Sequence, residues 1–237
     1  MKEKINKIIL GVITLFLSFN IFSEGTNNDK LLDNNQKIIY LTFDDGPSEN
    51  TDKILEILRK NDIKATFFVI GQNQDKYKKI VDEGHTIALH TYTHDYKKIY
   101  ASESAFFEDL YKIRDAVKAK TGIDSKIIRF AGGSSNHKAS KILKTSIIKR
   151  LTREGFVYHD WNCDSTDASG NKVPVSKLIE NATSCNSKEI NLLMHDSLPK
   201  KTTVEALQKI IDYYRAKGYK FEKITMSSFK AQHFKIK

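Results

Sequence analysis

Residues 41–47 read Leu-Thr-Phe-Asp-Asp-Gly-Pro and end an apolar run that begins at Ile38. The run predicts a buried strand, and the Gly-Pro pair predicts that this strand stops in a turn. Asp44 and Asp45 lie side by side at its end, where two like charges disfavour each other's ionisation. Because Asp, Gly and Pro are common turn residues, the stretch can be turn chemistry alone. The alternative is a site where a cation lies or where one of the acids works as a base.

From residue 37 onwards, apolar runs alternate with amphipathic stretches of helical period. The apolar runs predict seven strands, at residues 38–43, 65–70, 85–90, 126–130, 156–161, 190–194 and 221–225. The clearest helices are predicted at residues 51–60, 102–120 and 204–217. This alternation predicts an α/β fold with parallel strands and outer helices. The length of the chain fits a distorted (β/α)7 barrel that is closed or nearly closed.

The reactive side chains gather at the predicted carboxyl ends of the strands. They are Asp44 and Asp45 after the first strand, His90 and His94 after the third, Arg129 at the end of the fourth, Asp164 and Asp167 after the fifth, and His195 and Asp196 after the sixth. In β/α barrels the working groups lie at this end of the strands. The pattern therefore favours a functional site over turn chemistry alone.

His90 and His94 are the two ends of the stretch His-Thr-Tyr-Thr-His. On a helical turn this spacing places both imidazoles on one face, within reach of one cation. The spacing by itself is equally compatible with a structural role. Together with a carboxylate from the first strand end, the two histidines would form an open site for a divalent metal, with room for water and substrate. Zinc suits these ligands, as do cobalt, nickel and manganese.

Metal-assisted hydrolysis of an amide also needs a base and an acid. One aspartate of the pair Asp44 and Asp45 can bind the metal while the other takes the proton of the attacking water. His195 is the candidate acid, because a neighbouring carboxylate would keep its imidazole protonated. We expect Asp167 to be that carboxylate.

Five short motifs, in order over residues 38–225, resemble those of the polysaccharide deacetylases of carbohydrate esterase family four, also called the NodB-homology domain. This family includes peptidoglycan, chitin and nodulation-factor deacetylases. Residues 42–47 match its first motif without change, which implies that Asp44 is the general base and Asp45 a metal ligand. The resemblance implies hydrolysis of the acetamide of N-acetylglucosamine units in a glycan such as peptidoglycan, with release of acetate.

The second and third motifs add metal ligands and an oxyanion donor. The match to the second motif implies that His90 and His94 bind the metal. The stretch Arg-Phe-Ala-Gly-Gly, which starts at Arg129, resembles the third motif. It implies that Arg129 orients the catalytic base. The backbone N–H of Gly132 falls where the family places its oxyanion donor.

The fourth and fifth motifs lie around the predicted acid. The stretch from Trp161 to Ala168 resembles the fourth motif, in which Asp167 would tune the catalytic histidine. Residues 193–195, Leu-Met-His, match the fifth motif. This match implies that Leu193 lines the pocket for the acetyl methyl group and that His195 is the general acid.

Two departures from the family put the choice of substrate in doubt. The third motif usually reads Arg-Pro-Pro-Tyr-Gly, so here both prolines and the tyrosine are missing. The fourth motif usually ends in Asp-Trp, and Ala168 stands in place of the tryptophan. One wall of the acetate pocket is then smaller unless Trp161 fills the space. The open alternatives are an amidase or imidase that acts on a small substrate and a non-catalytic carbohydrate-binding homologue.

The amino-terminal residues predict export. Residues 1–23 combine a basic start with a short apolar run, which is typical of a signal peptide, and an uncleaved anchor is the alternative. Residues 24–36 are polar and read as a linker, which leaves residues 37–237 as the catalytic domain. We expect a secreted, periplasmic or cell-surface protein, tethered to the membrane only if the apolar run is retained. We also expect a monomer.

Composition and charge narrow the classes of molecule that this chain is expected to bind. The formal net charge is +10, but the lysines are scattered, and no aromatic-basic platform predicts binding to nucleic acid. A glycan is therefore the expected partner. Cys163 and Cys185 have no zinc-binding spacing, and a disulfide between them is open to an exported protein.

Overall fold

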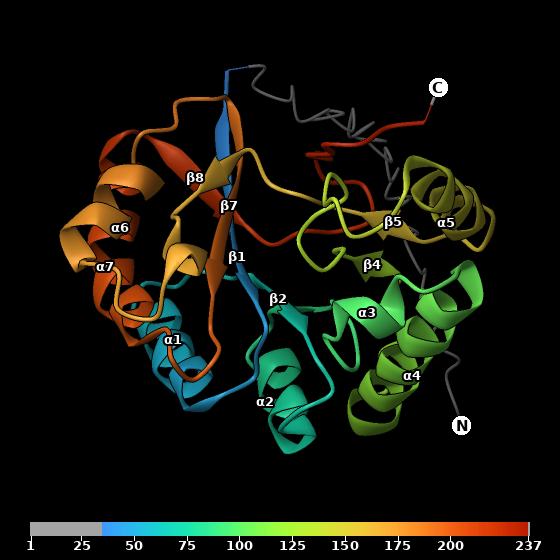
Figure 1. Cartoon of the computed structure of the whole chain (residues 1–237). Helices are drawn as coiled ribbons and strands as arrows, with labels where there is room; N and C mark the ends of the chain where they lie inside the picture. Colours follow the sequence, from blue (N-terminus) through green and yellow to red (C-terminus); the bar gives the residue numbers. More distant parts are fainter. Residues whose placement is uncertain (1–34, 237) are drawn as a thin grey trace, which may run out of the picture. The chain divides into compact units, whose positions relative to one another are not determined.

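The computed structural model describes residues 35–236, in which strand β1 (Lys37–Asp44) forms the centre of a parallel sheet (Figure 1). Three strands pair with β1: β2 (Thr66–Val69), β7 (Glu189–His195) and, near its amino end, β8 (Tyr219–Glu222). The strands run in the order β5-β4-β3-β2-β1-β7-β6. The remaining bounds are β3 (Thr86–Leu89), β4 (Ile127–Ile128), β5 (Val157–Tyr158) and β6 (Cys163–Asp164).

The parallel sheet and its helices confirm the predicted α/β fold, with one correction: the described residues form eight strands instead of seven. Strands β5 and β6 lie at the two edges of the sheet, so the distorted barrel is open, as a half-barrel. The additional strand is β6, whose two residues are too few to leave a pattern in the sequence. The run predicted at 156–161 is shortened to β5 because the carbonyls of His159 and Asp160 accept hydrogen bonds from Arg129.

Helices follow the strands and cover the outside of the sheet (Figure 1). Three of them begin at a serine cap: Ser48, Ser102 and Ser140 each accept a backbone hydrogen bond from the first turn of a helix. The three predicted helices are confirmed, with ends that differ by up to three residues. The bounds are α1 (Glu49–Lys60), α2 (Tyr77–Asp82), α3 (Tyr96–Ile99), α4 (Glu103–Thr121), α5 (Lys141–Arg153), α6 (Val175–Ala182) and α7 (Lys201–Ala216), with short 3₁₀ turns at Gln74–Lys76 and Asp167–Ser169.

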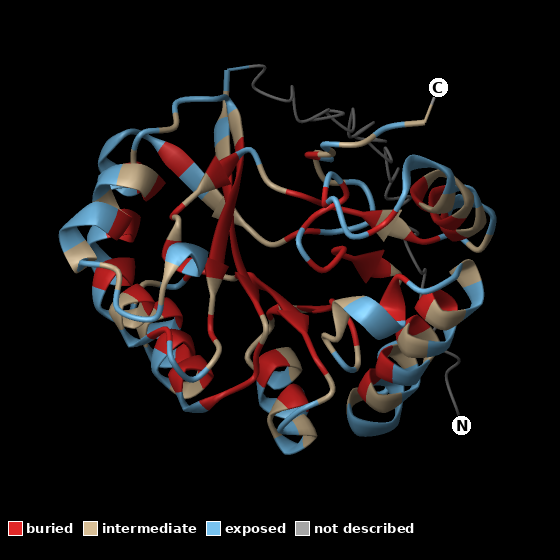
Figure 2. Cartoon of the chain, in the orientation of Figure 1, coloured by how far each residue is buried: buried red, intermediate tan, exposed pale blue. Residues whose placement is uncertain are grey.

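Strand β1 is buried over most of its length (Figure 2), and its side chains alternate between two environments. Ile39, Leu41 and Phe43 belong to the main core, whereas Tyr40 belongs to a smaller apolar cluster with residues of β2, β3 and β4. Because successive side chains of a strand point to opposite faces, Asp44 is directed to the same side as Tyr40. This alternation sends the acid into the interior of the half-barrel, away from the helices.

The described residues belong to one compact unit, residues 34–237. The predicted signal peptide or anchor and most of the predicted linker lie outside the described residues, so the expected domain boundaries stay predictions. No helix among residues 35–236 is long and apolar enough to cross a membrane. Cys163 of β6 and Cys185, in the loop after α6, form the disulfide that the sequence left open, with their Cα atoms 6.0 Å apart.

Candidate active site

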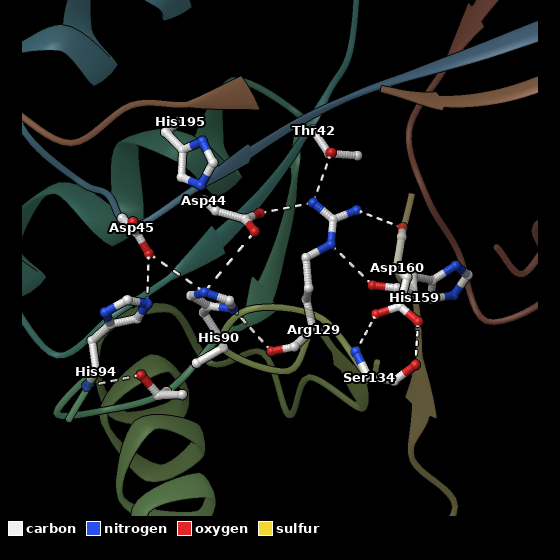
Figure 3. Close-up of polar contacts among 12 residues, drawn as sticks. Thr42, Asp44, Asp45, His90, His94, Arg129, Ser134, His159, Asp160 and His195 are labelled. Atoms are coloured by element: carbon white, nitrogen blue, oxygen red, sulfur yellow. Dashed lines mark hydrogen bonds and ion pairs between the residues drawn. The ribbon is translucent and has the colours of Figure 1, made fainter. Parts of the chain in front are cut away.

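Arg129 follows β4 and extends into the interior of the half-barrel, where its side chain is fully buried (Figure 3). Its Nη1 donates hydrogen bonds to Asp44 Oδ1 and to Thr42 Oγ1, both at 2.8 Å. The other three N–H groups donate to the carbonyls of His159 and Asp160 and to the side chain of Asn191. All five guanidinium donors therefore have acceptors. A guanidinium held this completely fixes the position of the Asp44 oxygen to which it donates.

Asp45, His90 and His94 bring three candidate ligand atoms within 4.8 Å of one another. Asp45 Oδ1 lies 3.4 Å from His90 Nε2 and 3.1 Å from His94 Nε2 (Figure 3). The predicted convergence of these residues is confirmed, but the predicted helical turn is wrong. Residues 90–94 form a bent loop in which His94 has a φ of +52°. Asp109 of α4 holds this loop by accepting hydrogen bonds from two of its backbone N–H groups.

The three residues fit a divalent cation. Asp45 Oδ1 is buried and has no hydrogen-bond partner among residues 35–236, although both imidazoles lie within ion-pair distance. His90 Nδ1 lies 2.9 Å from the carbonyl of Arg129, which can only accept, so Nδ1 carries a proton and Nε2 is left for a ligand. Burial and the neighbouring His90 lower the pKa of His94, which favours the neutral ligand form.

His195, at the end of β7, forms the second ionisable pair with Asp167. Its Nδ1 lies 2.7 Å from Asp167 Oδ1, while Asp167 Oδ2 accepts hydrogen bonds from His195 N and from Thr203 Oγ1, each at 2.7 Å. Burial opposes protonation of the imidazole, but the hydrogen bond and charge of Asp167, followed by the charges of Asp44 and Asp45, raise the pKa of His195 to about 9. This histidine is therefore held in its protonated form at neutral pH.

Gly132 lies in a tight turn after β4, next to the candidate metal ligands. Gly132 and Gly133 have φ values of +72° and +77°, in the left-handed region that favours glycine. Tyr96 connects Gly132 to the ligands, because a Cβ at Gly132 would lie 3.0 Å from Tyr96 Oη while the Tyr96 ring packs edge-on against His94. The backbone N–H of Gly132 has no acceptor within residues 35–236, so it can donate to a bound group.

The two predicted pocket residues have different surroundings. Leu193 is buried in β7 and, by strand alternation, is directed to the same side as Asn191 and His195, where the reacting groups lie. Trp161 packs edge-on against His233, with ring centroids 4.8 Å apart. It also lies so close to Gly133 that a Cβ there would be 2.8 Å from the indole. A role of Trp161 in the acetate pocket stays a prediction.

Comparisons with known proteins identify the family. The family model of the polysaccharide deacetylases matches residues 32–149. A peptidoglycan-N-acetylglucosamine deacetylase of Bacillus cereus is 32% identical, over 79% of this chain and 69% of its own length. This chain belongs to the polysaccharide deacetylase family. A bifunctional xylanase/deacetylase of Pseudobutyrivibrio xylanivorans is also 32% identical, over 90% of this chain, but the match covers only 34% of that protein.

Solved structures support both the family and the fold. The catalytic domain of a peptidoglycan N-acetylglucosamine deacetylase from Eubacterium rectale superposes with a TM-score of 0.81 at 38% identity, covering 86% of this chain and 95% of the other. A family 4 carbohydrate esterase from Streptomyces lividans, in complex with acetate, superposes with a TM-score of 0.69 at 25% identity, covering 82% of this chain and 96% of the other. The chain is therefore a deacetylase-family hydrolase with the half-barrel of its relatives.

In this polysaccharide deacetylase, the side chain of Asp196 packs against the Asp-Gly-Pro turn. Its carboxylate is so close to Gly46 that a Cβ there would lie 2.1 Å from Oδ2, and Thr51 Oγ1 donates to the same oxygen. Burial raises the pKa of Asp196 to about 7. Only glycine therefore fits at position 46, where the first motif also has glycine.

Sequence reasoning missed the groups that hold the site residues in place. Asn191 and the carbonyl of Asp160 complete the shell around Arg129, Thr203 holds Asp167, and Tyr96 lies against the turn of Gly132. Asn191 could have been found, since it is a polar residue at the centre of an apolar strand and has to find a partner. The others are ordinary polar positions of loops and helix starts, and nothing in their sequence context distinguishes them.

Proposed function

We propose that this protein is a metal-dependent N-deacetylase that hydrolyses the acetamide of N-acetylglucosamine units in a bacterial cell-wall or surface glycan, with peptidoglycan as the first candidate. One observation carries the proposal: a triad of candidate metal ligands lies beside an aspartate that a buried arginine fixes, and a histidine paired with a second aspartate lies within electrostatic reach of Asp44 and Asp45. An amide hydrolase needs these three groups around one bond.

Asp45, His90 and His94 would hold the cation through one carboxylate oxygen and two Nε2 atoms. A divalent ion there would act as a Lewis acid that polarises the amide carbonyl and makes the attacking water more acidic. Zinc is our first choice for this ligand set, and cobalt, nickel or manganese would also fit it. The donor chemistry, with no sulfur and an open side, supports a catalytic site over a structural one.

Asp44 would act as the general base that takes the proton of the attacking water. The salt bridge to Arg129 keeps its carboxylate oriented, with Oδ1 bound to the guanidinium and Oδ2 3.9 Å from His90 Nε2. The N–H of Gly132 would donate a hydrogen bond to the oxygen that becomes negative when the carbonyl is attacked. His195 would then give its proton to the leaving amine, and Asp167 would stabilise the imidazolium during this step.

The polar groove beside the triad suits a glycan. It has a volume of about 420 Å³ and opens next to Asp45, with Glu49, Asn73 and Lys76 among the residues that line it. Hydroxyl groups of a sugar can hydrogen-bond to such side chains. Peptidoglycan is favoured because several relatives carry its deacetylation in their names and because a chain with a net charge of +10 is attracted to an anionic wall.

We also propose export of the protein as a monomer. A disulfide between Cys163 and Cys185 supports this location, because disulfides persist mainly outside the reducing cytoplasm. Cleavage of residues 1–23 would release a secreted enzyme, whereas retention would tether it to the membrane.

The test is acetate release by purified residues 24–237 from chitin oligomers and from isolated peptidoglycan, beside the variants Asp44→Asn and His195→Ala. We expect release by the wild type and a loss of about a hundred- to ten-thousand-fold in each variant, the contribution of a positioned base or acid. Glu205→Gln, which changes an exposed acid of α7 outside the groove and outside the proposed machinery, is the matched control. Full activity of Asp44→Asn would refute the assigned chemistry. No release from any acetylated glycan by the zinc-loaded protein would redirect the proposal to a small amide or to a non-catalytic glycan binder.

A further inference from the structure

Asp160, between β5 and β6, is fully buried and hydrogen-bonds to three separate parts of the chain, of which Figure 3 shows Arg129 and Ser134. Its backbone carbonyl accepts from Arg129 Nη2 at 2.9 Å. Its side-chain Oδ1 accepts from the backbone N–H of Ser134 at 2.7 Å, and Oδ2 accepts from Ser134 Oγ at 2.5 Å. Oδ2 also accepts from the backbone N–H of His233 at 2.8 Å. One residue thus contacts the arginine of the proposed base, the turn of the proposed oxyanion donor and the carboxyl-terminal segment.

The contact with Ser134 acts on the turn that carries Gly132. Ser134 follows directly after Gly132 and Gly133, which both have positive φ values. Because glycine has the greatest conformational freedom of all residues, two adjacent glycines give this turn little rigidity of its own. The turn contains one internal backbone bond, from Gly133 N to the carbonyl of Phe130 at 2.9 Å. It also lacks the prolines that the family usually has at this place. A buried carboxylate that accepts two hydrogen bonds from one serine can supply the missing rigidity.

The carboxyl-terminal segment closes the same network from outside. Residues 231–234 lie beside β5: Ala231 accepts from Asp160 N at 2.7 Å, and Phe234 N donates to Ser134 Oγ at 2.9 Å. Tyr158 Oη holds the segment at a further point by donating to the carbonyl of Phe234 at 2.6 Å. This last bond anchors the carboxyl-terminal segment without touching the turn of Gly132. A variant that lacks the bond therefore tests the anchoring of the segment separately from the holding of the turn.

We infer that Asp160 is a positioning residue for deacetylation: through Ser134 it holds the N–H of Gly132 at the place where the oxyanion forms, and through its carbonyl it holds Arg129. The inference rests on the proposed function for its catalytic meaning. The position of the turn itself is a separate physical claim that can be measured without activity. Asp160 touches neither substrate nor cation in this arrangement, so it acts only through the two residues that it holds.

The variants are Asp160→Asn and Ser134→Ala, with Tyr158→Phe as the matched control. An asparagine at position 160 directs its own N–H group at one or more of the groups from which the carboxylate now accepts a hydrogen bond, so that bond is lost. Ser134→Ala removes the hydroxyl bond but keeps the backbone N–H, so it is the milder change and the variant that should fold in any case. Tyr158→Phe removes one bond of the carboxyl-terminal segment and leaves the turn of Gly132 unchanged.

The measurements are kcat and KM with an acetylated chitin oligomer, zinc content, and amide hydrogen exchange of residues 130–135. We expect Asp160→Asn to lower kcat about ten- to hundredfold, with KM changed less than about threefold, because a misplaced oxyanion donor acts on the transition state. Zinc content should stay unchanged and exchange in residues 130–135 should become faster. Ser134→Ala should show the same pattern to a smaller extent, and Tyr158→Phe should leave kcat within about twofold of wild type.

Either of two results would overturn the inference. The first is an Asp160→Asn protein with a kcat within about twofold of wild type, or with a loss that Tyr158→Phe reproduces, since the residue would then only fasten the carboxyl-terminal segment. The second is unchanged exchange in residues 130–135 in both Asp160→Asn and Ser134→Ala. If the wild type released no acetate, the proposed function would fail, and the exchange measurement would still decide whether Asp160 holds the turn.

Discussion

Replacing Asp167 with asparagine tests the assignment of His195 as the acid. The carboxylate accepts from His195 Nδ1 and from His195 N, each at 2.7 Å, and Asp167→Asn keeps the shape while it removes the charge. Burial alone would lower the pKa of His195, and Asp167 is the largest of the influences that raise it to about 9. Without that charge, we expect the pKa to fall to its ordinary value of 6.5 or below.

The size of the effect depends on pH. A general acid works only while it is protonated, and raising the pH through its pKa removes the active form. At pH 8, an imidazole with a pKa of about 9 is about nine tenths protonated, whereas one with a pKa of about 6.5 is about 3% protonated. The protonated fraction of His195 is therefore about thirtyfold lower in Asp167→Asn than in the wild type at pH 8, and it is nearly the same in both proteins at pH 6. A bound cation would lower the pKa of His195 in both the wild type and Asp167→Asn. The prediction therefore concerns the difference between the two pKa values.

The assay is kcat/KM for acetate release between pH 5.5 and 9.5, which reports the ionisation of the free enzyme. We expect the alkaline limb of Asp167→Asn to lie about two or more pH units below that of the wild type. Asp164→Asn is the matched control, because Asp164 is a nearby acid that makes no hydrogen bond to His195 among the described residues. A loss of activity that is uniform across the pH range, with both limbs in place, would refute the role of Asp167 in holding the proton.

Three further changes test other parts of the site. Asp45→Asn should weaken zinc binding at least about hundredfold in a competition titration, since even groups that only orient a ligand are worth ten- to hundredfold; unchanged affinity would place the metal elsewhere. Gly133→Ala should destabilise the protein by about 1–3 kcal/mol in chemical denaturation, because its Cβ would lie 2.8 Å from Trp161 at a φ of +77°; wild-type stability would show that the turn can relax. Replacing both Cys163 and Cys185 with serine should cost about 3 kcal/mol, as expected for opening a loop closed by a sequence separation of 22, and an unchanged melting temperature would contradict it.

Much of the fold and of the reacting residues followed from the sequence because the information is local. The apolar run of β1 and the turn of Asp44 and Asp45 are one continuous stretch, and a parallel sheet brings the carboxyl ends of its strands together without further detail. His90, His94 and His195 all lie at such ends. Their convergence follows from topology, even though the loop between His90 and His94 is not helical.

The supporting contacts could not be predicted because they connect distant parts of the chain through single polar groups. Asp160 joins Ser134, 26 residues before it, to His233, 73 residues after it, and neither partner lies in a recognisable motif. The two-residue strand β6 was missed for a similar reason, since its pairing with β7 and not its own pattern makes it a strand. Buried carbonyls that accept a hydrogen bond from a side chain, as at His159, leave no signal in the hydrophobic pattern of the sequence.

The most direct test of the central proposal is acetate release from isolated peptidoglycan during a zinc titration of the metal-stripped protein. We expect no release before zinc is added and a rate that rises in proportion to bound zinc until about one ion is bound per chain, the capacity of the one triad found within residues 35–236. His94→Gln, measured beside it, should need far more zinc to reach the same rate. Full release by the stripped protein, or one bound zinc with no release from any acetylated glycan, would contradict metal-dependent deacetylation at this site.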